Sequence, residues 1–310
     1  MRPWVTVWGY GTDISATQNT LFVREKGSPV PARYPLSEIS HLLIAGDNVL
    51  HTSAVLRCAE QNIPISFFDI RGRPSSVLQK PSPSRNPASD SSPVHTSAKS
   101  MIESAIEARM RFLHELAETH EDFYRVGEFD IIAGARAELD YLITLPELAR
   151  IFTLTKNMYY EILSRVLSAE LGYRRRVEGI SPDPVNVLFS KGYAALYATV
   201  QTACIGAGLD LSRSSIFGKV IPCTGSPCVR EIMEPALVPM VDRVVIETAM
   251  NPDLCMAYQQ ESRWMIPITI EDDFYQRLSA SIDVPCIEAN VEAYAEALHE
   301  GAAPEYHYPT

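Results

Sequence analysis

The basic residues between positions 174 and 243 are the side chains of this chain best suited to bind a charged substrate. Three arginines, Arg174–Arg176, stand just before a Pro-Asp-Pro-Val-Asn run at 182–186. One interpretation is a basic loop that contacts phosphate oxygens. The other is a charged helix end, which the helix dipole favours, and the residues alone leave both open. The weaker candidates for the same basic surface are Arg213, Lys219, Arg230 and Arg243.

The six cysteines do not form the pattern of a disulfide framework or a zinc site. They are scattered, and Cys223 and Cys228, in CTGSPC, are the only two that lie close together. A structural zinc needs four ligands, and no histidine lies between His120 and His299. We therefore expect reduced, partly buried thiols.

Three segments further along the chain carry a composite motif. They read SPDPVNVLFSKGYAALY at 181–197, GAGLDLSRSSIFG at 206–218 and VREIMEPALVPMVDRVV at 229–245. Together they resemble the core of the CRISPR-associated integrase, the larger protein of the CRISPR adaptation (spacer acquisition) machinery. The resemblance implies a metal-dependent DNA integrase or endonuclease of antiviral defence, with Mg²⁺ or Mn²⁺ held by a glutamate, a histidine and an aspartate.

The resemblance places these three ligand positions on Phe152, Gly218 and Glu231. Two of them have no metal-binding side chain, and the one carboxylate that remains, Glu231, does not usually hold Mg²⁺ without help from phosphate. Glu147 and Glu161 cannot replace the lost glutamate, because at about 100° per residue they point roughly 140° and 180° away from position 152. We expect Phe152 to be a core aromatic, Gly218 to be a turn glycine, and the metal site to be degenerate.

Several neighbours of these positions have two interpretations. Lys156, one turn after the first ligand position, and Lys219, directly after the second, are either solvated lysines, which we expect, or point charges in place of a metal. Glu234 is expected at a structural or dimer-contact position. Asp183 is expected to cap the next helix, and Asn186 to make a buried hydrogen bond.

Two functions of different classes follow from the resemblance. In the first, the chain is a catalytically impaired relative, a pseudoenzyme that binds double-stranded DNA or acts as a scaffold. In the second, it is an active metal-dependent endonuclease or integrase with a site rebuilt from other residues. Phe152 and Gly218 favour the first. The resemblance also implies a homodimer through the N-terminal domain and the small ferredoxin-like CRISPR adaptation protein as partner. A scaffold that does not bind DNA would instead pair with an active homologue.

The composition is that of an ordinary globular protein. The chain has 310 residues, of which 46% are hydrophobic and 21% charged, which is enough for about two domains. No apolar run approaches the ~18–20 residues of a membrane span, and the first residues show no signal or transit peptide, so a cytoplasmic protein is expected.

Charge argues weakly against a nucleic-acid partner. The net charge is −11, but a local basic patch is sufficient to bind DNA. From Ile287 onward there are five glutamates and no Lys or Arg. This acidic tail could fold over a DNA-binding groove as a mimic of DNA.

The order of apolar patterns predicts an α+β multidomain protein, with a small N-terminal β-rich domain followed by a larger all-helical C-terminal domain. Residues 1–80 hold short β-like runs, a helix capped by Thr52 or Ser53, and a Gly9-x-Gly11 pair that we interpret as a strand turn. Residues 81–100 contain four prolines and seven serines and are predicted to be a linker. Residues 101–310 form the helical domain with the degenerate metal and DNA site. Its helices are predicted at 101–120, 133–143, 146–168, 184–206, 229–250 and 289–299.

Overall fold

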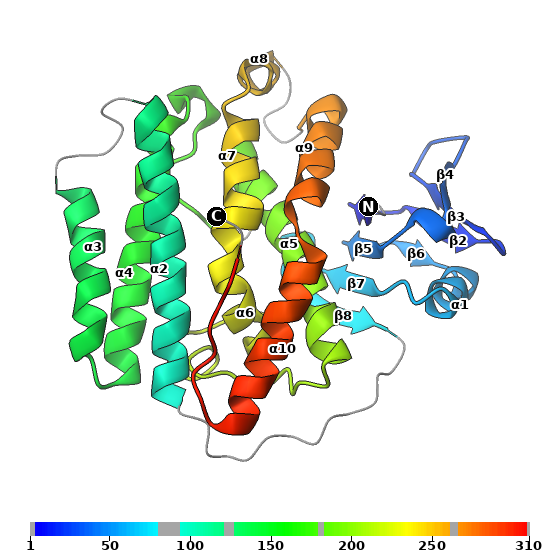
Figure 1. Cartoon of the computed structure of the whole chain (residues 1–310). Coiled ribbons are helices and arrows are strands. Elements are labelled where there is room, and N and C mark those ends of the chain that lie inside the picture. The colour runs from blue at the N-terminus through cyan, green and yellow to red at the C-terminus, as the bar shows by residue number, and fades with distance from the viewer. Residues whose placement is uncertain (1–3, 80–93, 121–126, 179–182, 261–265, 309–310) are drawn as a thin grey trace. The chain divides into compact units, whose positions relative to one another are not determined.

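The computed structural model describes residues 4–79, 94–120, 127–178, 183–260 and 266–308. The chain divides into two compact units, Met1–Pro83 and Ser84–Thr310. The first contains strands and one short helix and the second contains helices, so the predicted α+β class is confirmed (Figure 1).

The first unit is built from two four-stranded sheets, in the orders β1-β5-β7-β8 and β4-β3-β2-β6. Strand β5 pairs in parallel with β1 and β7, and all five of its residues, HLLIA, are buried. A continuous apolar strand of this kind is typical of a sheet covered on both faces. The elements are β1 (Trp4–Trp8), β2 (Asp13–Ala16), β3 (Thr20–Arg24), β4 (Ala32–Pro35), β5 (His41–Ala45), β6 (Val49–Leu50), α1 (Thr52–Glu60), β7 (Ile65–Phe68) and β8 (Pro74–Leu78).

Two local predictions for this unit have different outcomes. Helix α1 begins at Thr52 with His51 at the N-cap position and no capping side chain, so the cap predicted at Thr52 or Ser53 is wrong. Ser53 Oγ instead accepts a hydrogen bond from the backbone N–H of Ala16 at 3.3 Å, which ties the helix to β2. The Gly9-x-Gly11 pair lies between β1 and β2 with both glycines at positive φ, which confirms the strand turn.

The second unit is helical. Helices α2, α3 and α4 pack against one another on one side, and α6, α7 and α10 pack against α5 (Figure 1). Most of α5 is buried, as expected of a central helix. The helices are α2 (Val94–Thr119), α3 (Glu128–Glu138), α4 (Leu145–Val166), α5 (Pro184–Gly206), α6 (Pro227–Met233), α7 (Arg243–Ala249), α8 (Pro252–Gln260), α9 (Ile268–Ser281) and α10 (Val284–Glu300).

The helix boundaries correct several predictions. Helix α2 begins at Val94, inside the predicted linker at 81–100, because Ser97 and Ala98 continue its buried face. Helix α3 begins at Glu128 rather than 133, and α8 and α9 were not predicted. The predicted helix at 184–206 matches α5, and the side chain of Asp183 caps it by accepting from the Asn186 N–H at 2.7 Å.

The predicted continuous helix at 229–250 is broken. After α6 the chain forms a 3₁₀ turn, η4 (Glu234–Ala236), and then a π-helical turn, η5 (Val238–Asp242), before α7. Pro235 and Pro239 explain the break, since a proline has no N–H and its ring collides with the preceding turn. A Cβ on Gly192 of α5 would lie 2.5 Å from Val241 Cγ1, so glycine allows α5 to approach η5 closely.

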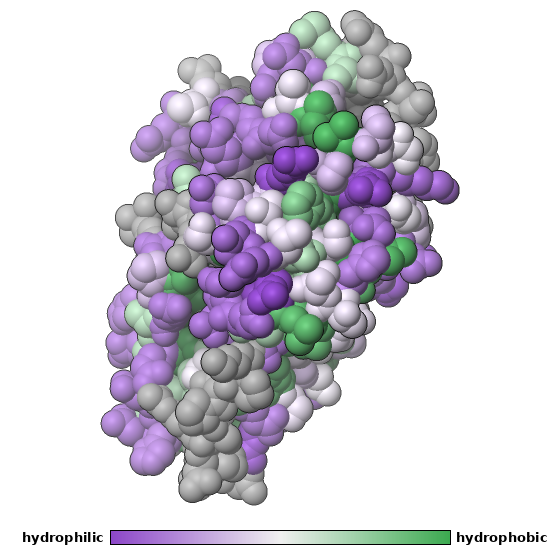
Figure 2. Space-filling model, turned by 90° about the vertical axis from the view of Figure 1, so that its right-hand side faces the viewer, coloured by the Kyte–Doolittle hydropathy of each residue, from purple (hydrophilic) through white to green (hydrophobic). Residues whose placement is uncertain are grey.

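The surface drawn in Figure 2 is mostly hydrophilic, with hydrophobic residues scattered among polar ones. Scattered apolar side chains are normal on a protein surface. None of the helices within the described residues is both long enough and apolar enough to cross a membrane.

Candidate functional site

Phe152 lies on α4, whose start is fixed by a capping box. The Thr144 N–H donates to Glu147 Oε2 at 3.0 Å, and the Glu147 N–H donates to Thr144 Oγ1 at 3.4 Å. Two turns later the Phe152 ring is buried, and it meets the ring of Phe217 edge to face with centroids 5.9 Å apart. The predicted core aromatic is confirmed.

Gly218 lies in an exposed turn with φ 74°, a conformation that favours glycine. The predicted turn glycine is therefore confirmed. The residue of this turn that faces Phe152 is Phe217, one position earlier, which sequence reasoning missed. The apolar Ile-Phe pair just before the glycine was the available signal, because an apolar pair before a turn glycine is expected to point into the core.

Glu231, on α6, is fully buried and its carboxylate is occupied by the loop that precedes the turn. It accepts from Ser214 Oγ at 2.6 Å, from the Ser215 N–H at 2.6 Å and from Ser215 Oγ at 2.5 Å. Burial raises the pKa of Glu231, and these hydrogen bonds oppose the rise. Its role in the structure is to hold the 214–215 loop against α6.

Two cations and one carboxylate surround Phe152. Arg109 of α2 is 1% exposed and its Nη2 donates to Glu234 Oε1 at 2.5 Å. Its guanidinium carbon lies 5.3 Å from the centroid of the Phe152 ring. Lys156 Nζ lies 5.5 Å from the same centroid and 3.9 Å from Glu234 Oε1. Lys156 is thus a half-buried neighbour of this group rather than the solvated lysine we expected, and Glu234 has the structural role that was predicted.

A series of hydrogen-bonded side chains connects α4 to η5. Tyr193 of α5 donates to Asp242 Oδ1 at 2.6 Å, and its hydroxyl is also hydrogen-bonded to that of Tyr160 on α4. Burial raises the pKa of Asp242 to about 7, while the Tyr193 hydroxyl and the charge of Arg109 lower it. These hydrogen bonds link α4, α5 and η5 through two buried groups, Tyr160 and Asp242, and the partly buried Tyr193.

The three consecutive arginines are not equivalent. Arg174 and Arg175 are exposed. Arg176 is half-buried, its Nη1 donates to Asn186 Oδ1 at 3.0 Å, and its guanidinium carbon lies 5.3 Å from the Tyr193 ring centroid. Asn186 also donates to Asp183 Oδ2 at 2.9 Å, which confirms its predicted buried hydrogen bond. Arg176 therefore anchors the loop, while Arg174 and Arg175 are available to phosphate.

The other basic candidates also include an exposed residue and residues with internal partners. Lys219 is exposed on the turn, whereas Arg230 donates to Thr224 O at 3.1 Å and Thr224 Oγ1 at 3.0 Å. Arg243 is paired with Glu115 at 2.6 Å. Within the described residues, no group of three or more His, Cys, Asp or Glu side chains is placed to hold a metal ion.

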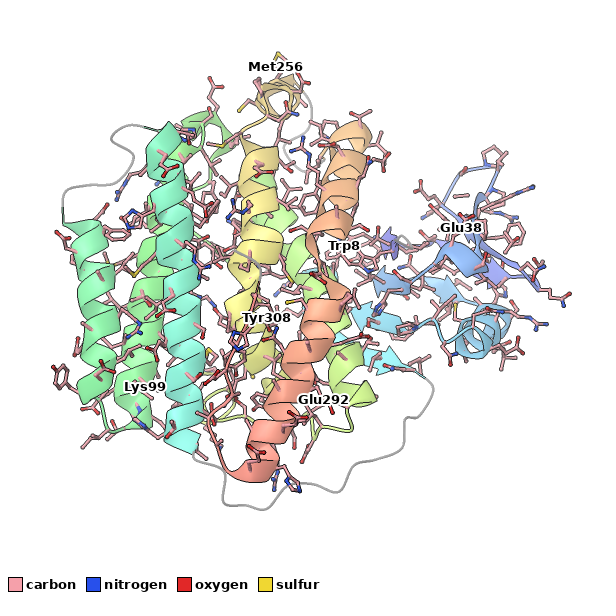
Figure 3. The ribbon with its side chains drawn as sticks, in the orientation of Figure 1. Trp8, Glu38, Lys99, Met256, Glu292 and Tyr308 are labelled. Atoms are coloured by element: carbon pink, nitrogen blue, oxygen red, sulfur yellow. The ribbon has the colours of Figure 1, made fainter. Side chains whose placement is uncertain are left out.

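The C-terminal acidic region is mostly the packed helix α10 rather than an extended tail, and its role as a mimic of DNA stays a prediction. Asn290 of α10 is buried and makes two hydrogen bonds with the backbone of His307. Its Nδ2 donates to the His307 carbonyl and its Oδ1 accepts from the His307 N–H, both at 2.8 Å. Tyr308 Oη then donates to Ile232 O at 2.8 Å (Figure 3). The segment 302–308 is thereby held against the helices of its own unit.

Solved structures of other proteins share this fold. The chain is similar to a casposase bound to integration product (16% identity, TM-score 0.71, covering 98% of this chain and 94% of that one). It is also similar to a chain of a Cas6-RT-Cas1–Cas2 complex (15% identity, TM-score 0.74, covering 99% of this chain and 36% of that one). At these identities the likeness establishes the fold.

Sequence comparison establishes the family. The model of the family described as CRISPR associated protein Cas1 matches residues 5–259. A putative CRISPR-associated endonuclease, Cas1 2 of Methanospirillum hungatei, is 30% identical over 210 residues, which cover 65% of this chain and 68% of that protein. The chain belongs to the Cas1 family of CRISPR adaptation integrases and endonucleases, as the motifs at 181–245 predicted.

Proposed function

We propose that this chain is a DNA-binding Cas1-family protein of CRISPR adaptation that has lost metal-dependent strand chemistry. The observation that carries the proposal is the contact between Phe152 and Phe217 at 5.9 Å. The Phe152 ring takes the position where the family resemblance expects a glutamate, and it packs on Phe217, the residue directly before the histidine position at Gly218. Neither ring has an atom that binds Mg²⁺ or Mn²⁺, which prefer oxygen and, for Mn²⁺, also imidazole.

The remaining polar groups at this place do not fit a divalent ion either. The carboxylate of Glu231 already accepts three hydrogen bonds from Ser214 and Ser215. The carboxylate of Glu234 is paired with Arg109, and Lys156 adds a second positive charge within 3.9 Å of it. A divalent ion would have to displace these partners against the repulsion of two cations, so we assign no reaction step to a metal here.

DNA binding in this proposal needs only exposed positive charge on a rigid loop. Arg174 and Arg175 supply it, since Arg176 and Asn186 hold their loop against α5. Lys219 is a further exposed cation. Contacts of this kind bind phosphates without sequence preference and weaken as salt rises. The similarity to a casposase bound to integration product supports this part of the proposal.

The assembly we propose follows the family. The β-rich unit would form a homodimer, and the protein would associate with the small ferredoxin-like adaptation protein and with an active homologue. The similarity to a chain in a Cas1–Cas2 complex supports such partners. In this assembly the chain contributes a DNA-binding surface, and the partner homologue contributes catalysis.

The test is to measure binding and strand chemistry in the same preparation. We expect the protein to retain branched duplex DNA in a mobility-shift assay at low salt, and to show no nicking or strand transfer with Mg²⁺ or Mn²⁺. A Cas1 relative with an intact Glu-His-Asp ligand set is the positive control. Mn²⁺-dependent nicking that disappears in Glu231→Ala would show instead that the enzyme is active with a rebuilt site.

A further inference from the structure

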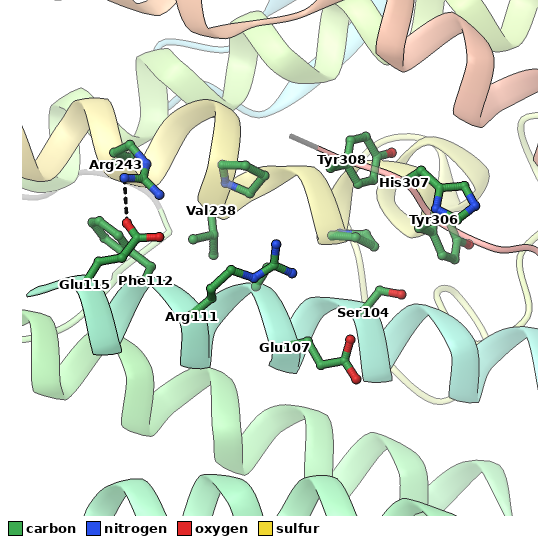
Figure 4. A pocket seen from close by; sticks show the side chains of 13 residues that line it. Ser104, Glu107, Arg111, Phe112, Glu115, Val238, Arg243, Tyr306, His307 and Tyr308 are labelled. Atoms are coloured by element: carbon green, nitrogen blue, oxygen red, sulfur yellow. Dashed lines mark ion pairs between the residues drawn. The ribbon is translucent and has the colours of Figure 1, made fainter. Parts of the chain in front are cut away.

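A second candidate site lies away from the Phe152 region. A cavity of about 250 Å³ opens between α2 and the chain from Pro235 to Arg243, and residues 306–308 close one end of it (Figure 4). The residues that line it do not include Phe152, Phe217 or Glu231. The cavity is thus separate from the three positions discussed above.

Among the charged side chains that line the cavity, Arg111 is the one without an ion-pair partner within the described residues. Glu115 is paired with Arg243 at 2.6 Å, and Glu107 accepts from Arg136 of α3 at 2.9 and 3.0 Å. Arg111 has no carboxylate partner within the part of the chain that the structure describes, and Figure 4 shows its side chain rising from α2 into the cavity. The Arg111 guanidinium therefore favours a ligand that brings a negative group.

Two lining side chains offer partly exposed surface for a planar ring, Tyr308 and Pro239. Phe112 is buried, and the guanidinium carbon of Arg243 lies 5.2 Å from its ring centroid. The Tyr308 ring is fixed because its hydroxyl donates to Ile232 O at 2.8 Å. Aromatic rings held in place favour the stacking of another planar ring, and nucleobases stack on such rings regardless of their identity.

We propose that this cavity binds a single nucleotide unit, with its base against Tyr308 and Pro239 and its phosphate on Arg111. Arginine suits the phosphate because its planar fork can donate two hydrogen bonds to it. The volume of about 250 Å³ falls just below the ~300–1,000 Å³ of common ligand pockets, so a ligand no larger than one nucleotide is expected. The nearby carboxylates of Glu107 and Glu115 disfavour a second or third phosphate.

Two sources can supply this ligand, a free mononucleotide or an unpaired nucleotide at the end of a DNA strand. The second source rests on the DNA binding proposed above. An acidic peptide could also bind Arg111, through a carboxylate. It is the alternative ligand that the experiment must reject.

The experiment is calorimetric titration of the intact chain at low salt with deoxyadenosine monophosphate, deoxyadenosine and inorganic phosphate. We expect the monophosphate to bind, and each of its two parts to bind at least about tenfold more weakly, because each lacks either the charge-assisted hydrogen bonds or the stacked base. Arg111→Gln should weaken the monophosphate at least about tenfold. The matched control is Arg150→Gln, which removes an exposed guanidinium on α4 paired with Glu138 and should leave the affinity unchanged.

Four results would overturn the proposal: no monophosphate binding at millimolar concentration, equal binding by Arg111→Gln, equal binding of phosphate alone, or tighter binding of an aspartyl-phenylalanine dipeptide.

The source of the nucleotide is decided with DNA hairpins that are blunt or carry one unpaired 3′ adenosine. A preference for the overhang that Arg111→Gln abolishes identifies the DNA end as the source, and no preference identifies the free nucleotide. A variant with Arg174→Ala and Arg175→Ala should lose duplex binding and keep monophosphate binding, so the two proposals fail separately.

Discussion

The two faces of helix α2 use the same residue type in opposite ways. Arg109 and Arg111 stand two residues apart, which places their side chains about 200° apart around the helix. Arg109 is 1% exposed, pairs with Glu234, and lies against the ring of Phe152. Arg111 is exposed in a cavity, with no carboxylate partner among the described residues. The Arg109 cation is paired inside the helical unit, whereas the Arg111 cation remains available to a ligand.

The largest expected effect comes from breaking the buried pair. Arg109→Leu leaves Glu234 buried without its main partner, and we expect a loss of about 3–5 kcal/mol in the free energy of unfolding. Arg109→Leu combined with Glu234→Leu should recover most of this loss, because no unpaired charge remains. Urea unfolding monitored by helical circular dichroism measures both variants.

The control for this experiment is Arg111→Leu on the other face of α2, which should change the stability by no more than about 0.5 kcal/mol. If Arg109→Leu were as mild as Arg111→Leu, the two faces would not differ in the way described.

The second effect is a pH dependence on the buried side. The pKa of Asp242 is raised from 3.8 to about 7 by burial, so the folded state favours the protonated carboxyl. This contribution to stability is present in acid below the unfolded pKa and is lost as the pH rises toward 7. Replacing Asp242→Asn removes the titration, so wild type should lose roughly 3–4 kcal/mol relative to the variant between about pH 4 and 7.

Unfolding curves at a series of pH values check this prediction, with Asp183→Asn as the control for an acidic residue in the same unit. Because Arg109 lowers the pKa of Asp242, the titration in Arg109→Leu should move to still higher pH. A constant difference between wild type and Asp242→Asn across this range would contradict the buried carboxyl described here.

The smallest effect separates the arginines of the 174–176 loop. Arg174→Ala and Arg175→Ala should each reduce the slope of log affinity for duplex DNA against log salt by about 0.9, since each removes one phosphate contact. Arg176→Ala should leave that slope nearly unchanged and cost about 1–3 kcal/mol of stability, because it strips a hydrogen bond from the buried Asn186 network. Equal slope changes for all three would mean that Arg176 leaves its internal partners when DNA binds.

Local signals in the sequence were enough to predict much of the helical unit. The Asp183 cap and the following proline define the start of α5, as predicted. The Thr144–Glu147 capping box also lies in the sequence but was not used, and the predicted start of α4 was one residue late. The prediction at 229–250 failed because hydrophobic periodicity was extended across Pro235 and Pro239. Those prolines are visible in the sequence, but the 3₁₀ and π turns that accommodate them depend on packing against α5.

The candidate site was less predictable because its partners are distant along the chain. Arg109 and Glu234 are 125 residues apart, and no local pattern marks Arg109 as buried. The family alignment located the turn at 216–218 but assigned its inward position to Gly218, whereas the ring that meets Phe152 belongs to Phe217. A one-residue difference of this kind depends on the direction of a side chain, which spacing alone does not determine.

The contact between Ser100 Oγ and the carbonyl of Pro304 joins positions 204 residues apart, and it bears on how the protein is made. During synthesis α2 leaves the ribosome early, but the segment that packs beside its first turns emerges some 200 residues later, at about 5–20 residues per second. The β-rich unit, Met1–Pro83, can complete its own contacts during that interval. The helical unit cannot close the cavity beside Arg111 until residues 306–308 have been translated, so a ribosome that stalls before them leaves that site unfinished.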